Sequence, residues 1–180
     1  MKRLIQQKPK HGRRIRLSEY FFNFDKMNYI KAQKPEGCII CLITENSKEV
    51  VNLTVWENDS FIVTVNLYPY NPGHLLICPK RHITDLRDFT PEEEEIFLTL
   101  QRRFLDILDS LYSPCGYNIG FNMGLVAGAS IEHLHLHIIP RYPKEIGIAD
   151  LVAGKRVLVE DPLESTRKIR ETLHRTPFHL

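Results

Sequence analysis

The 180-residue sequence predicts an α+β fold: a mainly antiparallel sheet of about five strands with one long central helix and a C-terminal helix. Two observations lead to this prediction. Strand-like runs follow one another across short turns, which is typical of antiparallel hairpins. One long amphipathic pattern then interrupts them, so strands and helices do not alternate. Apolar residues make up 43% of the chain, enough to build the core of one domain.

The first half of the predicted sheet contains three strands. Runs 50–56 and 61–66 are rich in β-branched and aromatic residues, and the turn sequence 58–60 separates them. The turn sequence 71–73, Asn-Pro-Gly, leads into a third strand at 74–79, which ends at Pro79. Short turns of this kind favour antiparallel pairing of the strands they connect.

A long helix is predicted to begin at Thr90. Thr90 is a suitable N-cap, Pro91 suits the first helical position, and Glu93 is placed to complete a capping box. The residues of its apolar stripe recur at helical spacing: Ile96, Phe97, Leu100, Phe104, Ile107, Leu108 and Leu111. The stripe is wide enough to serve both the core and a partner subunit.

The chain after this helix is predicted to return to the sheet. Residues 116–122 read as a strand, 127–130 as a loop of small residues, and 132–141 as a further strand. A last helix is expected over 163–173. The strand at 132–141 carries the most unusual pattern in the chain.

Bulk composition limits the classes of function. We divide the chain into a basic arm, 1–16, and one domain, 17–180, because the arm has seven basic and no acidic residues. The arm is interpreted as a solvated tail, and nucleic acid is the alternative partner.

No apolar run is long enough to cross a membrane, and no secretory signal follows the arm. Four scattered cysteines fit a cytoplasmic protein with reduced thiols.

Three histidines alternate with large aliphatic residues in the last predicted strand. The strand period places His133, His135 and His137 on one face. An exposed face that happens to carry histidine is one interpretation; a site for chemistry or metal is favoured, because buried ring nitrogens need partners. Neutral imidazole can attack phosphorus, so His135 is the candidate nucleophile and His137 a donor to phosphate. Gly128 and Ser130 could bind an anion, or form an ordinary turn.

A second motif, Cys38-x-x-Cys41, has the spacing that lets two thiolates bind one zinc ion. His82 and His133 are the best candidates to complete a tetrahedral site. The alternative interpretation is two small buried cysteines in a connector. A redox role would need a thioredoxin-like context, which the sequence lacks.

These motifs together resemble the histidine triad (HIT) superfamily of nucleotide hydrolases and transferases. The similarity extends over Cys38-x-x-Cys41, the run 66–74, Asn122 with the loop 128–130, and the histidine triple, and covers roughly residues 20–160. It is closest to the branch of bacterial and archaeal diadenosine tetraphosphate phosphorylases and hydrolases. The resemblance implies a HIT-like fold, a homodimer and a nucleotide substrate.

The resemblance also implies roles for individual residues. His135 would form a nucleotidyl-histidine, while His137, Ser130 and Gly128 hold the α-phosphate. The remaining nucleotide contacts would be Asn66 at the ribose, Asn122 at the phosphate, and Phe61 and Leu67 around the base. A structural zinc would be bound by Cys38, Cys41, His82 and His133.

The expected activity is cleavage of a nucleoside phosphoanhydride, with diadenosine tetraphosphate or a related dinucleoside polyphosphate as substrate. Two alternatives stay open: a nucleoside phosphoramidase of the same superfamily, and a nucleotide- or nucleic-acid-binding module that uses the basic arm. The sequence does not separate a phosphorylase from a hydrolase, because phosphate and water are both small acceptors that enter the same pocket.

Overall fold

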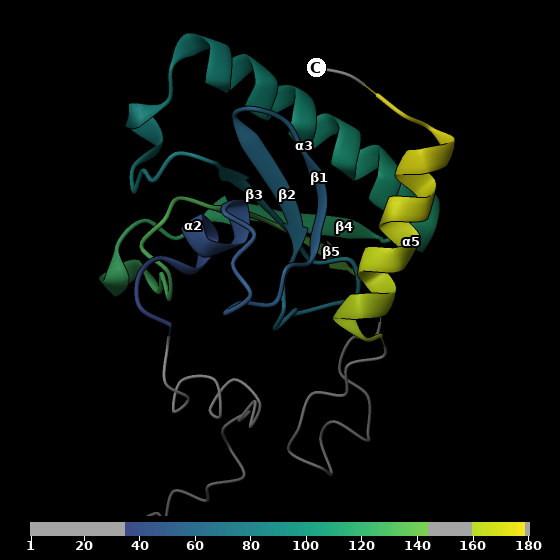
Figure 1. Ribbon diagram of the computed structural model, residues 1–180. Coiled ribbons are helices and arrows are strands. Elements are labelled where there is room, and N and C mark those ends of the chain that lie inside the picture. The colour runs from purple at the N-terminus through teal and green to yellow at the C-terminus, as the bar shows by residue number, and fades with distance from the viewer. Residues whose placement is uncertain (1–34, 144–159, 179–180) are drawn as a thin grey trace, which may run out of the picture.

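The structure is a computed structural model that describes residues 35–143 and 160–178 (Figure 1). The predicted arm 1–16 lies outside these residues. The described elements, in chain order, are α2 (Ile39–Thr44), β1 (Thr54–Glu57), β2 (Phe61–Val65), β3 (Leu75–Pro79), η2 (Leu86–Asp88), α3 (Pro91–Tyr112), β4 (Gly116–Phe121), η3 (Leu125–Ala127), β5 (Leu136–Arg141) and α5 (Pro162–Arg175). None of the described helices has the length and hydropathy of a membrane span.

The strands form one sheet in the order β1-β2-β3-β5-β4, and every neighbouring pair is antiparallel. The predicted α+β class is therefore confirmed. Strands β2 and β3 lie inside the sheet and are buried along their whole length. This explains why Thr64 is the only polar residue in these two strands, because a strand covered on both faces has no side that favours polar residues.

Helices cover the two faces of the sheet unequally (Figure 1). Helices α3 and α5 pack on one face, where Phe61, Phe104 and Ile138 are fully buried in the main core. The short helix α2 covers part of the other face, where Ile40 packs on Ile62 and Leu76. His137 on β5 and His135 just before it point to this second face, because Leu136 and Ile138 point to the first.

Helix α3 begins as predicted. The Thr90 hydroxyl accepts the Glu93 N–H at 3.2 Å, and the Glu93 carboxylate accepts the Thr90 N–H at 2.9 Å, which completes the capping box. Arg81 donates to both carboxylate oxygens of Glu93, at 2.7 and 2.6 Å. This bidentate pair ties the helix start to the segment that follows β3.

Two predicted strand boundaries and one alternative interpretation are wrong. The strand expected from Val50 begins only at Thr54, because the Asn52 side chain accepts the Thr54 N–H and forms a local turn instead. The strand expected from Glu132 begins at Leu136, so His133 and His135 precede it. The cysteine motif is not in a connector: Cys38 is the N-cap of α2, and Cys41 lies in its first turn.

Candidate active site and metal centre

A cavity of about 390 Å³ opens on the sheet face that carries α2. One wall consists of aliphatic residues from α2 and the loop after it, including Ile39, Ile43 and Val51. Asn66 and Leu67 also line the cavity, and His135 and His137 contribute imidazole rings to it. The cavity therefore combines an apolar surface with two histidine side chains. A ligand that has a flat apolar group and a phosphate would fit such a lining.

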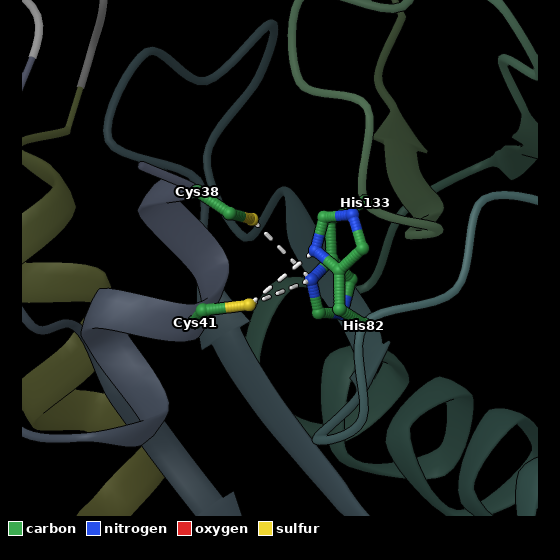
Figure 2. Close-up of side chains that lie close together, drawn as sticks. All are labelled: Cys38, Cys41, His82 and His133. Atoms are coloured by element: carbon green, nitrogen blue, oxygen red, sulfur yellow. Dashed lines mark hydrogen bonds between the residues drawn. The ribbon is translucent and has the colours of Figure 1, made fainter. Parts of the chain in front are cut away.

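Four candidate metal ligands converge beside this cavity. The Sγ atoms of Cys38 and Cys41 and one ring nitrogen each of His82 and His133 all lie within 4.8 Å of one another. Figure 2 shows both sulfur atoms directed at the two rings. The His133 Nδ1 atom is 3.4 Å from the Cys38 Sγ and 3.5 Å from the Cys41 Sγ. The His82 Nδ1 atom is 3.4 Å from the Cys41 Sγ.

The protonation states of this cluster suit a metal. His133 Nε2 lies 2.8 Å from the Pro79 carbonyl oxygen, so the neutral ring carries its proton there and directs the Nδ1 lone pair at the sulfur atoms. Burial lowers the pKa of His133 to about 4, which keeps the ring neutral. Burial and the neighbouring Cys38 thiol raise the pKa of Cys41 to about 11, so a metal ion must displace a proton there. The two-sulfur, two-nitrogen donor set fits zinc.

Main-chain contacts hold the two histidines in place. The Leu134 N–H donates to the Ile83 carbonyl at 2.7 Å, which joins the segment after β3 to the segment before β5. His82 and His133 therefore face each other with ring centroids 4.9 Å apart. Ligands separated by about fifty residues in sequence meet because both segments leave the same end of paired strands.

The ring of His135 is held in one tautomer. Its Nδ1 atom lies 2.7 Å from the His133 carbonyl oxygen, which can only accept, so Nδ1 carries the proton and the lone pair is on Nε2. Burial lowers the pKa of His135, so the ring stays neutral at physiological pH. Neutral imidazole with one fixed tautomer can attack phosphorus without an activating base.

His74 completes a histidine chain that the sequence interpretation missed. It is fully buried at the start of β3, and its Nε2 atom is 3.0 Å from the His137 Nδ1 atom. The Tyr70 N–H donates to His74 Nδ1 at 3.1 Å, so the neutral His74 ring donates through Nε2 to His137. His137 then carries its own proton on Nε2. A histidine placed directly after an Asn-Pro-Gly turn and before a fully apolar strand was the available signal.

The small-residue loop forms one rim of the cavity. Gly124 and Gly128 adopt positive φ angles of 85° and 90° around the 3-10 turn η3. The N–H groups of Gly128 and Ala129 donate inside this turn, to the Leu125 and Gly124 carbonyls. Gly128 still lines the cavity, together with Asn122 and Ser130. Ser130 is exposed there, so its hydroxyl can reach a bound phosphate.

The residues expected at the nucleoside are only partly brought together. Asn66 and Leu67 line the cavity, and the Asn66 side-chain oxygen accepts the Tyr68 N–H at 3.0 Å. Phe61 does not line the cavity, because it is fully buried on the opposite face of the sheet. The centroid of its ring lies 5.8 Å from that of Phe89 and 5.9 Å from that of Phe97. All five residues of β2 are buried, so the sequence could not show which of them face α2.

Several known proteins are similar to this chain in sequence and in fold. A family model described as the HIT domain matches residues 44–144. A protein named AP-4-A phosphorylase from Mycobacterium tuberculosis is 35% identical over 121 residues, which cover 67% of this chain and 62% of that protein. A bis(5'-nucleosyl)-tetraphosphatase (asymmetrical) from Schizosaccharomyces pombe is 39% identical over 88 residues, 49% of this chain and 48% of that protein.

Among solved structures, a zinc-bound histidine triad family protein from Mycobacterium smegmatis is 25% identical. Its TM-score is 0.63, over 78% of this chain and 95% of that one. The chain spans less than two thirds of the length of the two enzymes named above. Because the HIT domain model matches more than half of this chain, over a segment that holds the histidine triple and most of the residues that line the cavity, the chain belongs to the histidine triad (HIT) family.

Proposed function

We propose that the protein cleaves a nucleoside phosphoanhydride through His135, with diadenosine tetraphosphate or a related dinucleoside polyphosphate as substrate. The observation that carries the proposal is the His135 Nδ1 contact with the His133 carbonyl at 2.7 Å, in a ring that lines the cavity. This contact leaves the Nε2 lone pair as the nucleophile. The names of the mycobacterial and yeast relatives support the substrate class.

The proposed reaction has two displacements at the α-phosphorus. His135 Nε2 attacks this phosphorus, a P–N bond forms, and the P–O bond to the leaving polyphosphate breaks. Water or phosphate then attacks the same phosphorus, the P–N bond breaks, and the electron pair returns to Nε2. His137, whose proton is placed on Nε2 by His74, can donate to the phosphate oxygens or to the leaving group.

The charge distribution suggests how the substrate lies. Apart from the histidines, the only charged side chain among the described residues that line the cavity is Glu49. A triphosphate or tetraphosphate would not bind well inside such a site. We therefore place only one nucleoside and its α-phosphate in the cavity, with the remaining phosphates directed to solvent.

We further propose that Cys38, Cys41, His82 and His133 bind one zinc ion. The support is the donor set, the neutral His133 ring and the zinc-bound mycobacterial relative of similar fold. Zinc would crosslink α2 to the two segments that carry the histidines. Its role is structural, because the nucleophile does not need it. All four cysteines are free thiols, in keeping with the cytoplasm as the proposed location.

The test is His135→Asn, with the exposed His174→Asn as the matched control. His135→Asn should abolish turnover of diadenosine tetraphosphate and leave AMP binding within about threefold, because asparagine keeps a donor near the His133 carbonyl but cannot form a P–N bond. Turnover that persists in His135→Asn would refute the proposed mechanism.

The second nucleophile is identified from the products. Wild-type protein incubated with phosphate gives ADP and ATP if phosphate is the acceptor, and AMP and ATP if water is. Chromatography of the products with and without phosphate separates a phosphorylase from a hydrolase. Absence of turnover across a panel of dinucleoside polyphosphates would contradict the substrate class.

We also propose a homodimer joined through β4 and α3. Strand β4 is at an edge of the sheet, and its residues 118–120 are exposed. Ile119 on this strand and Leu98 on α3 are 44% and 47% exposed, which is high for large aliphatic side chains. An uncovered edge strand can pair with the same strand of a second copy.

A further inference from the structure

We propose that occupancy of the metal site controls nucleoside binding, because helix α2 belongs to both sites. This inference rests on the proposed function and deepens it. Cys38, the N-cap of α2, and Cys41 in its first turn are the proposed metal ligands, and Ile39, Ile40 and Ile43 on the same helix line the cavity. A metal ion that fixes α2 would therefore also fix one wall of the nucleoside pocket.

Helix α2 has little stability of its own. It contains six residues, its N-cap Cys38 makes no side-chain capping bond, and its first turn has no acidic residue. Isolated helices of this length do not form in water, because one or two turns do not offset the cost of nucleation. The helix therefore depends on contacts with the rest of the domain.

Among the described residues, the apolar contact is centred on Ile40. This side chain is 1% exposed and packs on Ile62, Leu76 and Cys78, while Ile43 packs at the margin of this small cluster. The other connection is the metal site. Without the metal ion, α2 would be attached to the sheet through Ile40, with Cys38 and Ile43 at the margin of its cluster, and through weak thiol–imidazole hydrogen bonds to His82 and His133.

The histidine half of the metal site is held independently. His133 Nε2 donates to the Pro79 carbonyl, and the Leu134 N–H donates to the Ile83 carbonyl. These main-chain contacts do not involve α2. Loss of the metal should therefore release the cysteine side of the site, while His133 and the nucleophile His135 keep their positions.

The loosened segment is the one that forms the apolar wall. Beyond α2, the loop that follows it contributes Val50, Val51 and Leu53 to the cavity. When metal is absent, nucleoside binding must itself order this wall. The free energy spent on ordering lowers the nucleoside affinity. The coupling is reciprocal, so a bound nucleotide must raise metal affinity by the same factor.

The test uses the full chain, loaded with one equivalent of zinc or stripped with a chelator, and AMP as the probe. Calorimetric titration should give an AMP dissociation constant about tenfold higher for the stripped protein, reversed by zinc. A zinc indicator competition should show AMP raising zinc affinity by the same factor. The exposed Cys115→Ser is the matched control and should behave as wild type.

The outcomes are distinguishable. Equal AMP affinity with and without zinc would overturn the coupling and leave the proposed function standing. Failure of both forms to bind AMP would overturn the proposed function and the coupling together. Ile43→Ala should weaken AMP binding while keeping one zinc per chain, because this side chain lines the cavity but binds no metal.

Amide hydrogen exchange separates this coupling from general destabilisation. Zinc removal should increase exchange over residues 39–53 and leave β2, β3 and β5 protected. If protection were lost across the whole sheet, the metal would be a global stabiliser, and the inference would be wrong.

Discussion

The proton positions of His133 and His135 are determined by main-chain oxygen atoms. The Pro79 carbonyl accepts from one ring, and the His133 carbonyl accepts from the other. The first contact directs a lone pair at the cysteines, and the second directs a lone pair at the cavity. Two histidines separated by one residue thus present their lone pairs to different surroundings, which is the basis for the proposed roles of His133 as a metal ligand and His135 as the nucleophile.

We predict that the acid limb of kcat/KM lies below pH 6.5. Protonation of His135 removes the nucleophilic lone pair, so activity falls as the pH drops through its pKa. Burial lowers that pKa from its ordinary value of about 6.5, so the fall occurs at a lower pH than for an exposed histidine. Initial rates at subsaturating substrate, from about pH 4 to 8, provide the measurement. An acid limb centred above pH 7 would contradict the assignment.

His74→Phe should lower kcat by about 100-fold and change KM little. Phenylalanine keeps an aromatic ring beside Tyr70 but cannot donate to His137 Nδ1, so the His137 tautomer is no longer fixed. Steady-state kinetics at constant pH provide the test, and a melting curve establishes that the variant is folded. An unchanged kcat would show that His74 is not a positioning residue.

At the scale of elements, α3 shows how closely local sequence can specify structure. Its N-cap, first residue and capping-box acid are all at the predicted positions. The ion pair between Arg81 and Glu93 then joins this local motif to the rest of the domain. Helix α2 is the opposite case, because it has no side-chain cap and its main anchor is the packing of Ile40 on the sheet, which the local sequence does not reveal.

Thr90→Ala should destabilise the protein by about 1 kcal/mol, because the Glu93 N–H loses its acceptor. For a chain of this size the melting temperature should fall by roughly 2–4 °C. The matched control is Thr99→Ala, where the hydroxyl bonds only to the Glu95 carbonyl within the helix. Differential scanning calorimetry compares the two, and equal shifts would argue against a special role of the cap.

The two edges of the sheet differ at the scale of the whole molecule. Strand β1 is covered by α5, and the Arg170 guanidinium donates to the Thr54 carbonyl. No described helix packs in the same way along β4, whose middle residues are exposed. Sheet edges left uncovered invite pairing with another chain, which is the basis of the proposed dimer.

Ile119→Lys should convert a wild-type dimer to a monomer at micromolar concentration. If two copies pair through β4, the introduced lysine of each copy would lose its hydration and would lie near the same lysine of the other copy. Both effects oppose pairing at this edge. Leu163→Lys on α5 is the control, since Leu163 is 65% exposed on another element. Sedimentation velocity reports the change, and a monomeric wild-type protein would disprove the interface.

Much of the fold could be predicted because its signals are local. The capping box of α3 and the turns between strands involve residues close in sequence. Phe61 shows where this approach fails. Every residue of β2 is buried, so no polar alternation marks the face that meets α3. Only packing against Phe89 and Phe97 shows that the ring lies away from the cavity.

By itself, the sequence determined the residue types that can do the chemistry and their spacing along the chain. The alternation after Glu132 directs His135 and His137 to one side, and the interval from Cys38 to Cys41 is one helical turn. The proton of His135 is placed by the His133 carbonyl, two residues away. Only the tertiary structure decided which nitrogen of His133 and of His137 carries the proton. Those protons are placed by groups 54 and 63 residues away, Pro79 for His133 and His74 for His137. Contacts between such distant segments form only when the strands pair, so no local pattern can encode them.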